Sequence, residues 1–445
     1  MKISREELTS MLRLALPVVV AELGWVSMSI VDTMMVGRLG PEAIGAVSVG
    51  NSLFIAAAIF GIGLLLGLDT FISRAFGAEN HSECRRWLAH GVLLSLFLTP
   101  PLTGAVLLPI LFLDEWGTRP EVLFLAIPYL KTLAFGVLPL LLYASFRRYL
   151  QALSRVAVVM FALITANLVN AIANWILIFG NLGFPPLGVE GAGWATFISR
   201  SYMAFVLFAV ILYAERHRIQ AFIKEFTHFE KQRLKDLLSL GFPAAIQLTL
   251  EIGVFATATA LVSRLEPLSL AAHQVALATA SFTFMVPLGV SAAGAVRVGQ
   301  AMGRGRPDQA ADSGWMALIV GSVFTSFAAL MFLIFPVQIL GLYTPEKTVI
   351  AVGVPLLAIA AFFQVFDGLQ VISTGVLRGT GETRTAMKAS LVCHWFLGLP
   401  IGYFLCFTLD WGVFGIWVGL STGLTVVGIW LVSFWAFRTR KMGGE

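Results

Sequence analysis

One apolar segment, residues 361–379, has a carboxylate near its middle, and it offers the clearest chemistry in the chain. A helix through this segment places Asp367, Gln370 and Thr374 on one face, because side chains three or four positions apart lie together. A charged carboxylate inside a membrane costs roughly 2.5–3.5 kcal/mol. We therefore interpret Asp367 as part of a binding or coupling site.

Three further acidic residues lie inside long apolar segments: Asp32, Asp69 and Glu251. Asp69 lies near the end of its segment, close to Arg74, and we expect it to be structural. Asp32 and Glu251 lie deeper, and we interpret both as functional, because an unpaired carboxylate in a membrane is hard to keep for structure alone. We predict that Glu251 or Asp367 exchanges a proton for a metal ion or an organic cation.

Amide and thioether side chains lie one helical turn from these carboxylates, and three asparagines form a row on another segment. Oxygen atoms from several helices suit a hard monovalent cation or a proton relay. The asparagine row is equally consistent with hydrogen bonding between helices. The side chains that we expect to line a cavity are Met28, Asn170, Asn174, Gln247 and Gln370.

The composition is that of a polytopic membrane protein. Of 445 residues, 58% are hydrophobic and only 12% are charged, whereas soluble domains contain about 25% charged residues. Three cysteines form no CxxC pair and six histidines are scattered, so neither a zinc nor a haem site is expected, and we predict no cofactor. The net charge of +5 comes from basic loops and does not indicate nucleic-acid binding.

Twelve apolar segments are long enough to span a membrane as helices, so the predicted fold class is all-α. One set of connections contains 24 Lys and Arg residues and the alternate set four, which predicts cytoplasmic termini in a cell membrane. The predicted spans are 11–36, 45–73, 88–111, 122–146, 157–179, 190–213, 237–263, 270–299, 312–336, 350–376, 387–407 and 411–435.

The two halves of the chain are repeats, since three short matches share one offset of 226 residues. The matched pairs are 12–17 with 238–243, 38–41 with 264–267, and 75–77 with 301–303. Six spans per half make the repeats parallel, a topology suited to alternating access around a central cavity. We predict an N-terminal lobe (1–213), a cytoplasmic amphipathic linker (214–236) and a C-terminal lobe (237–445).

Six short motifs are spread over nearly the whole chain: VDTM at 31–34, Asn170 with NW at 174–175, GFP at 241–243 followed by Glu251, AHQVA at 272–276, DGLQV at 367–371 and LRG at 377–379. Together they resemble the multidrug and toxic compound extrusion (MATE) transporters, most closely their bacterial NorM branch. The AHQVA motif adds Gln274 to the candidate cavity residues.

The resemblance implies a V-shaped bundle of two pseudo-symmetric six-helix lobes. It implies export of cationic, amphipathic compounds in exchange for inward Na⁺ or H⁺. Glu251 and Asp367 would form the cation site, with Na⁺ as the candidate metal, and Asp32 would serve coupling or drug release. The implied partners are small organic cations, the coupling cation and the lipid bilayer, and a MATE-like carrier is expected to be a monomer.

Three other functions remain open at this point. A lipid-linked oligosaccharide flippase shares the architecture, but it would need a cluster of cavity arginines, and only Lys131 and Arg200 are basic residues inside the predicted spans. An intramembrane enzyme is disfavoured, because the chain has no HExxH motif and no GxSxG with a basic partner. A channel is less compatible with kinked repeats. The coupling ion and the drug spectrum are not determined by the sequence.

Overall fold

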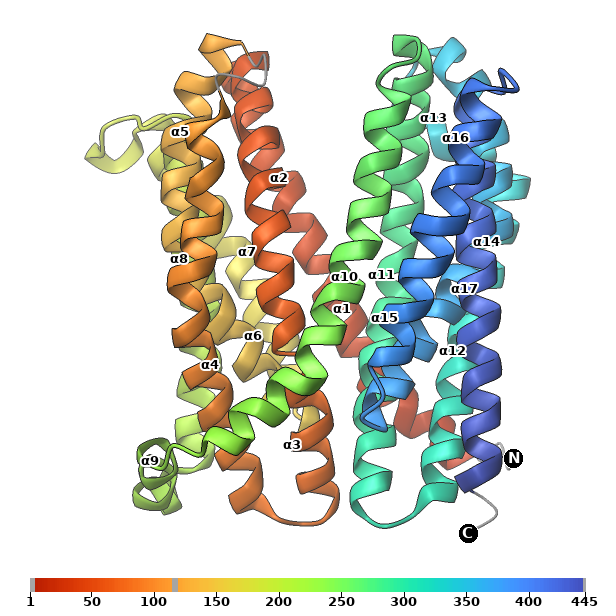
Figure 1. Ribbon diagram of the computed structural model, residues 1–445. Helices are drawn as coiled ribbons and strands as arrows, with labels where there is room; N and C mark the ends of the chain where they lie inside the picture. Colours follow the sequence, from red (N-terminus) through yellow and green to blue (C-terminus); the bar gives the residue numbers. More distant parts are fainter. Residues whose placement is uncertain (1–4, 114–118, 443–445) are drawn as a thin grey trace. The chain divides into compact units, whose positions relative to one another are not determined.

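The computed structural model describes residues 5–113 and 119–442. These residues are almost entirely helical, and none of them forms a β-strand (Figure 1). Within the described ranges, eleven helices are long and apolar enough to cross a membrane, and the pair α5 (Pro120–Phe135) and α6 (Val137–Ala152), bent by 43°, makes a twelfth span if counted as one. The predicted all-α fold with twelve spans is confirmed.

The chain forms two compact units, which we call the N unit (Val20–Ala245) and the C unit (Met1–Val19 with Ile246–Glu445). The helices that begin before the linker are α1 (Arg5–Val36), α2 (Pro41–Leu64), α3 (Gly67–Gly77), α4 (His81–Leu107), α5, α6, α7 (Val156–Phe179) and α8 (Val189–Ala214). Short 3₁₀ turns occupy η1 (Gly37–Leu39), η2 (Leu108–Leu111), η4 (Asn181–Gly183) and η5 (Arg216–Arg218).

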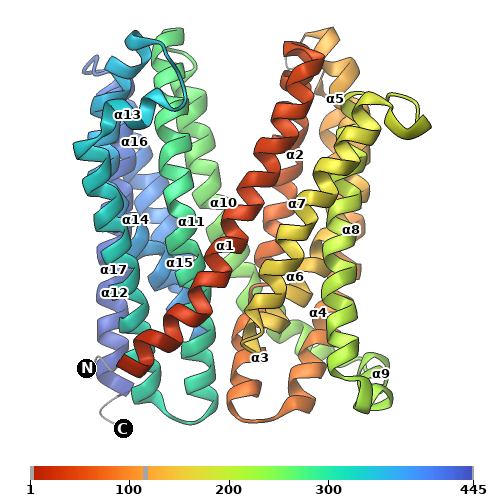
Figure 2. The same cartoon turned by 180° about the vertical axis from the view of Figure 1, so that it is seen from behind.

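The second half of the chain follows the short helix α9 (Ile219–Thr227). Its helices are α10 (Lys231–Val262), α11 (Pro267–Gly303), α12 (Pro307–Ile334), α13 (Pro336–Gly341), α14 (Lys347–Gly379), α15 (Arg384–Ser390), the π-helix η6 (Leu391–Gly398), α16 (Leu399–Phe407) and α17 (Val413–Met442). Inside the C unit, α14 packs against α11, α12 and α17 (Figure 1). Inside the N unit, α8 packs against α5, α6 and α7, and Figure 2 shows α7 and α8 side by side.

Helix boundaries recur at the offset found in the sequence. Both α1 and α10 begin and end 226 positions apart, and so do the proline starts of α2 and α11. The paired boundaries are Arg5 with Lys231, Val36 with Val262, Pro41 with Pro267, and Gly77 with Gly303. The repeat found in the sequence is therefore also a repeat of helix boundaries in the structure.

The division between the units falls inside α1 and inside α10, after Val19 and after Ala245. These positions also differ by 226, and each lies two residues after a proline inside the helix, Pro17 or Pro243. The first part of α1 thus belongs to the C unit, where Glu7 forms an ion pair with Arg297. The first part of α10 belongs to the N unit.

The helix α9 is docked on the N unit through both apolar and polar contacts. Phe222 is buried in the hydrophobic core of this unit. The Glu225 carboxylate accepts hydrogen bonds from Arg86 at 2.9 Å and from Ser82 at 3.0 Å. Burial raises the pKa of Glu225, but these hydrogen bonds outweigh burial and hold the pKa below its ordinary value. That α9 lies on a membrane surface stays a prediction.

Candidate cation and substrate sites

In the C unit, two amides hold the Glu251 carboxylate. Glu251 lies on α10 and is 8% exposed. Its Oε2 accepts a hydrogen bond from Nε2 of Gln247, one turn earlier on the same helix, at 2.5 Å. A second hydrogen bond comes from Nε2 of Gln370 on α14, at 3.2 Å. Both amides hold the carboxylate in place, and the Gln370 amide joins α10 to α14.

Asp367 lies on α14, three residues before Gln370, and is also 8% exposed. The Glu251 carboxylate repels the Asp367 carboxylate. The oxygen atoms of Asp367 have no hydrogen-bond partner among the described residues. Two buried carboxylates that repel each other are costly unless a cation or a proton lies between them. The Glu251–Asp367 pair can therefore take up one positive charge.

The donor atoms of this pair suit a hard monovalent cation. Besides the two carboxylates, the Oε1 atom of Gln370 is buried and has no hydrogen-bond partner among the residues that the structure describes. Oxygen donors of this kind are preferred by hard cations, whereas zinc and copper prefer histidine and cysteine. Within the described ranges, no group of three or more His, Cys, Asp or Glu side chains is placed to hold a metal ion.

Gln274 and Met28, two of the predicted cavity residues, make none of these contacts. Gln274 on α11 is exposed, and Met28 on α1 is packed in the hydrophobic core of the N unit. In the part of the chain that the structure describes, Gln274 makes no side-chain hydrogen bond. The structure therefore brings Gln247, Gln370, Glu251 and Asp367 together, without Gln274.

In the N unit, the asparagine row faces Asp32. Nδ2 of Asn174 donates to Oδ1 of Asp32 at 2.5 Å and to Oδ1 of Asn170 at 3.1 Å. Both asparagines are fully buried on α7, and Asp32 on α1 is half-buried. The polar face that the sequence left between two interpretations is thus in direct contact with the acidic residue of the first span.

Sequence reasoning missed other neighbours of Asp32. The Asp32 carboxylate accepts a hydrogen bond from Thr196 of α8. Its charge also acts on Arg200 of α8 and on Tyr129 of α5. Arg200 was noted as an unassigned base inside a span, and no sequence pattern linked it to Asp32. The glycine positions of α8 could have pointed to close packing at this place, because Gly193 leaves no room for a Cβ beside Thr132.

Sequence reasoning also missed Glu22, an acidic residue in the first span. The structure pairs Glu22 with Arg147. It also pairs Asp69 with Arg148 at 3.0 Å, consistent with the structural role expected for Asp69. Both arginines lie in α6 and were assigned from the sequence to a cytoplasmic connection. Glu22 could have been found from the sequence, because it is an acidic residue inside the first apolar segment, ten residues before Asp32.

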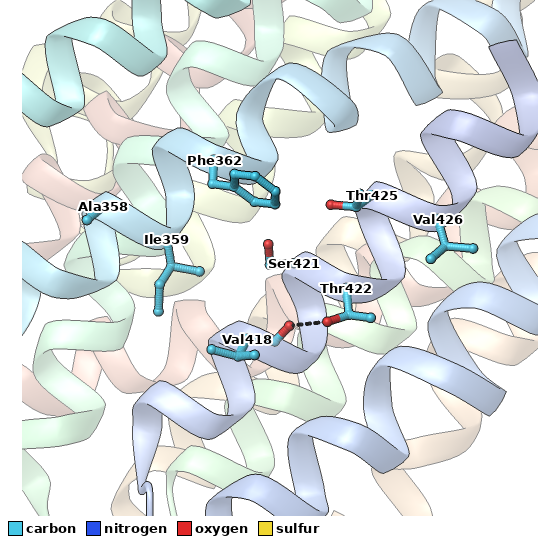
Figure 3. A pocket seen from close by; sticks show the side chains of 8 residues that line it. All are labelled: Ala358, Ile359, Phe362, Val418, Ser421, Thr422, Thr425 and Val426. Carbon is cyan, nitrogen blue, oxygen red and sulfur yellow. Dashed lines mark hydrogen bonds between the residues drawn. The ribbon is translucent and has the colours of Figure 1, made fainter.

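A groove of about 550 Å³ lies between α14 and α17 in the C unit (Figure 3). Its walls are apolar apart from three hydroxyl groups, and the exposed ring of Phe362 stands opposite Thr425. The lining residues are Ala358, Ile359, Phe362, Val418, Ser421, Thr422, Thr425 and Val426. None of the predicted site residues is among them, so this groove is distinct from the carboxylate pair.

Comparison with known proteins gives consistent matches. The MatE family description matches residues 17–176 and 243–404. A "Probable multidrug resistance protein NorM" of Mesorhizobium japonicum is 35% identical, over 98% of this chain and 95% of its own length. A protein of the same description from Pasteurella multocida is 33% identical, over 99% of this chain and 95% of its own.

Two solved structures share the fold. The eukaryotic MATE transporter AtDTX14 superposes with a TM-score of 0.87 at 20% identity, and 98% of each chain is covered. An outward-facing multidrug resistance MATE family transporter of the MOP superfamily gives a TM-score of 0.88 at 20% identity, over 98% of this chain and 96% of its own.

Proposed function

This chain belongs to the MatE family of membrane transporters, and on that premise we propose that it is a secondary antiporter that exports cationic, amphipathic compounds in exchange for inward Na⁺ or H⁺. Export of several compounds is supported by the names of relatives that match nearly the whole chain. Exchange for a cation is supported by one observation above the others, the buried and unneutralised pair of Glu251 and Asp367.

In this proposal the coupling cation binds between Glu251 and Asp367. The amide of Gln370 supports it by holding Glu251 and by offering a free oxygen. A bound cation changes the relative free energies of two conformations only if it binds one of them more tightly. The cation would favour one opening of the transporter and the exported compound the other. Competition between the two gives exchange.

The test is ethidium efflux from proteoliposomes under an imposed Na⁺ gradient and, separately, under a pH gradient. We expect wild type to respond to one gradient and Asp367→Asn to respond to neither while remaining folded. The matched control is Asp308→Asn, which removes an exposed carboxylate at the start of α12 in the same unit. Normal gradient-driven efflux by Asp367→Asn would refute the coupling site.

Which gradient drives the wild type identifies the ion. A response to Na⁺ alone makes the pair a sodium site, and a response to pH alone makes it a proton site. Efflux that follows neither gradient would refute antiport, and the oligosaccharide flippase would then be the function to test.

A further inference from the structure

The connection between α7 and α8 exposes an apolar tip, and we call residues 180–188 the apolar loop. Six consecutive residues of this loop, 182–187, are exposed. Leu182 is 73% exposed and Phe184 is 55% exposed. The loop sequence, GNLGFPPLG, contains no charged residue. The other connections on the side with few basic residues contain the charged residues Arg38, Arg119, Arg264, Glu346 and Asp410.

Leu182 is held in a strained backbone conformation at the tip of the loop. Its φ and ψ angles are 56° and 27°, in the left-handed region. This region favours glycine, because the Cβ of any other residue crowds the following carbonyl oxygen. The exposed leucine side chain recovers little of this cost by packing within the described chain. Strain that persists in this way indicates a function, which here lies in a contact outside the chain.

The polar groups of the loop are largely satisfied within the chain. Nδ2 of Asn181 donates to the carbonyl of Trp175 at 2.8 Å. Pro185 and Pro186 have no N–H to donate. The backbone N–H groups that donate to carbonyls of the chain are those of Gly180, Phe184, Leu187 and Gly188. Because an unpaired backbone group is costly away from water, this loop is suited to a region with little water.

The loop leaves the N unit sideways, across the direction of its helices (Figures 1 and 2). A Cβ on Gly193 of α8 would collide with Oγ1 of Thr132 of α5, so these two residues lie at one level. Thr132 lies twelve residues after the start of α5, and Gly193 four residues after the start of α8. At 1.5 Å per residue, α8 therefore begins about 12 Å below the start of α5. The loop thus lies on the flank of the unit.

We infer that the apolar loop is an anchor that inserts Leu182 and Phe184 into the surface of the surrounding bilayer. Aliphatic and aromatic side chains are favourable at the boundary between headgroups and acyl chains, where a charged loop would remain in water. The flank of a membrane-spanning bundle faces lipid, which makes lipid the partner. The anchor fixes the level of the end of α7. The inference goes beyond the proposed function, because it depends on neither the coupling ion nor the cargo.

A fluorescent label at the tip tests the anchor. Leu182→Cys and Phe184→Cys are each labelled with a nitrobenzoxadiazole (NBD) maleimide and reconstituted into phosphatidylcholine liposomes. The native cysteines are buried, and wild type treated in the same way gives the background labelling. The control is Glu42→Cys, an exposed position at the start of α2 in the same unit. A Cβ on Gly45 would contact Val122, so Glu42 lies level with the start of α5.

Lipids that carry a nitroxide near the headgroup or near the end of an acyl chain quench the label according to its depth. At positions 182 and 184 we expect emission shifted to shorter wavelength and stronger quenching by the shallow nitroxide, at a depth of about 5–10 Å into the headgroup–acyl boundary. The label at position 42 should emit as in water and be quenched by neither lipid. Adding Leu182→Asp to Phe184→Cys should reduce the shallow quenching toward the control, because a charged tip resists insertion.

Water-like emission at both tip positions would overturn the anchor. Stronger quenching by the deep nitroxide would overturn the surface location, and shifted emission without quenching would show that protein, such as a second copy of the chain, covers the tip. Unchanged quenching after Leu182→Asp would remove Leu182 from the contact. Gel filtration shows that each labelled variant is folded. Failure of gradient-driven efflux refutes antiport and leaves these readings unchanged, since no gradient is used.

Discussion

Gln370 joins the two helices of the carboxylate pair. It donates to Glu251 on α10 while lying one turn from Asp367 on α14. Gln247 donates to the same carboxylate from its own helix, so it cannot fix the distance between the helices. Gln370 therefore stabilises the Glu251 carboxylate and also fixes the position of α10 relative to α14.

We expect Gln370→Leu to raise the concentration of driving cation needed for half-maximal efflux by about tenfold or more, because a hydrogen bond to a charged group is lost. The matched control is Gln274→Leu, which removes an exposed amide from α11 of the same unit. Efflux is titrated against the driving cation in proteoliposomes. Equal effects of the two substitutions would contradict the role of Gln370.

The ion pair of Glu22 and Arg147 gives a prediction about stability. Both side chains are almost nine-tenths buried. Glu22→Gln leaves a buried guanidinium without its counter-charge and should lower the free energy of unfolding by about 3–5 kcal/mol. Adding Arg147→Met should recover most of this loss, because the uncompensated charge is then removed. Thermal unfolding in detergent measures both effects, and a double variant no more stable than Glu22→Gln would contradict the pairing.

At the scale of the helix, α16 and α17 pack through glycine. A Cβ on Gly419 would lie 2.3 Å from the Cα and N atoms of Gly402, where only backbone can be displaced. A Cβ on Gly415 of the same helix would lie 2.5 Å from the backbone N atom of Cys406. Small residues let helices in a membrane approach closely enough for van der Waals packing to hold them together.

We expect Gly419→Ala to destabilise the protein by about 1–3 kcal/mol through overpacking. Gly104→Ala in α4 is the control, since a Cβ there meets nothing within 4 Å. That change should be neutral or stabilising by up to about 1 kcal/mol, because alanine restricts the unfolded chain. The midpoint of thermal unfolding should therefore fall for Gly419→Ala and stay unchanged or rise for Gly104→Ala, and an equal fall in both variants would contradict the packing.

The two repeats break their helices at different places. In the first half, α5 and α6 are separated at Gly136, whereas the corresponding helix α14 is continuous. In the second half, the π-helix η6 separates α15 from α16, whereas α7 is continuous. Such interruptions are frequent at functional sites. The break at Gly136 is the point that the Arg200 side chain reaches.

At the scale of the whole molecule, the chain passes from one unit to the other just after Pro17 and Pro243. Proline has no N–H to donate, so the helix lacks one hydrogen bond at this point and bends more easily. Both repeats have a proline just before the point where the chain passes between the units. This correspondence favours a role for the two prolines in the motion that transport requires.

We expect Pro17→Ala and Pro243→Ala each to lower the rate of gradient-driven efflux several-fold while leaving thermal stability unchanged or higher. Alanine restores the missing hydrogen bond and stiffens the helix. The control is Pro355→Ala, an exposed proline inside α14 that lies far along the chain from either crossing. Efflux that falls equally for Pro355→Ala would assign the effect to helix propensity in general.

The sequence alone determined the membrane class, the twelve spans, the repeat at 226 residues and the acidic residues of interest. These features follow from apolar length, spacing and charge along one dimension, which need no knowledge of neighbouring helices. The boundaries of α1 and α10 show how directly such a pattern enters the fold, since the same offset separates them.

The tertiary structure alone decided which charges meet. Three contacts depend on how helices distant in sequence are rotated toward each other: the pairing of Glu22 with Arg147, the hydrogen bond from Gln370 to Glu251 and the position of Arg200 over the Phe54 ring. Rotation is set by close packing of many side chains and glycines at once, and periodicity within one helix does not contain it. The partner of a buried charge is therefore a property of the folded bundle.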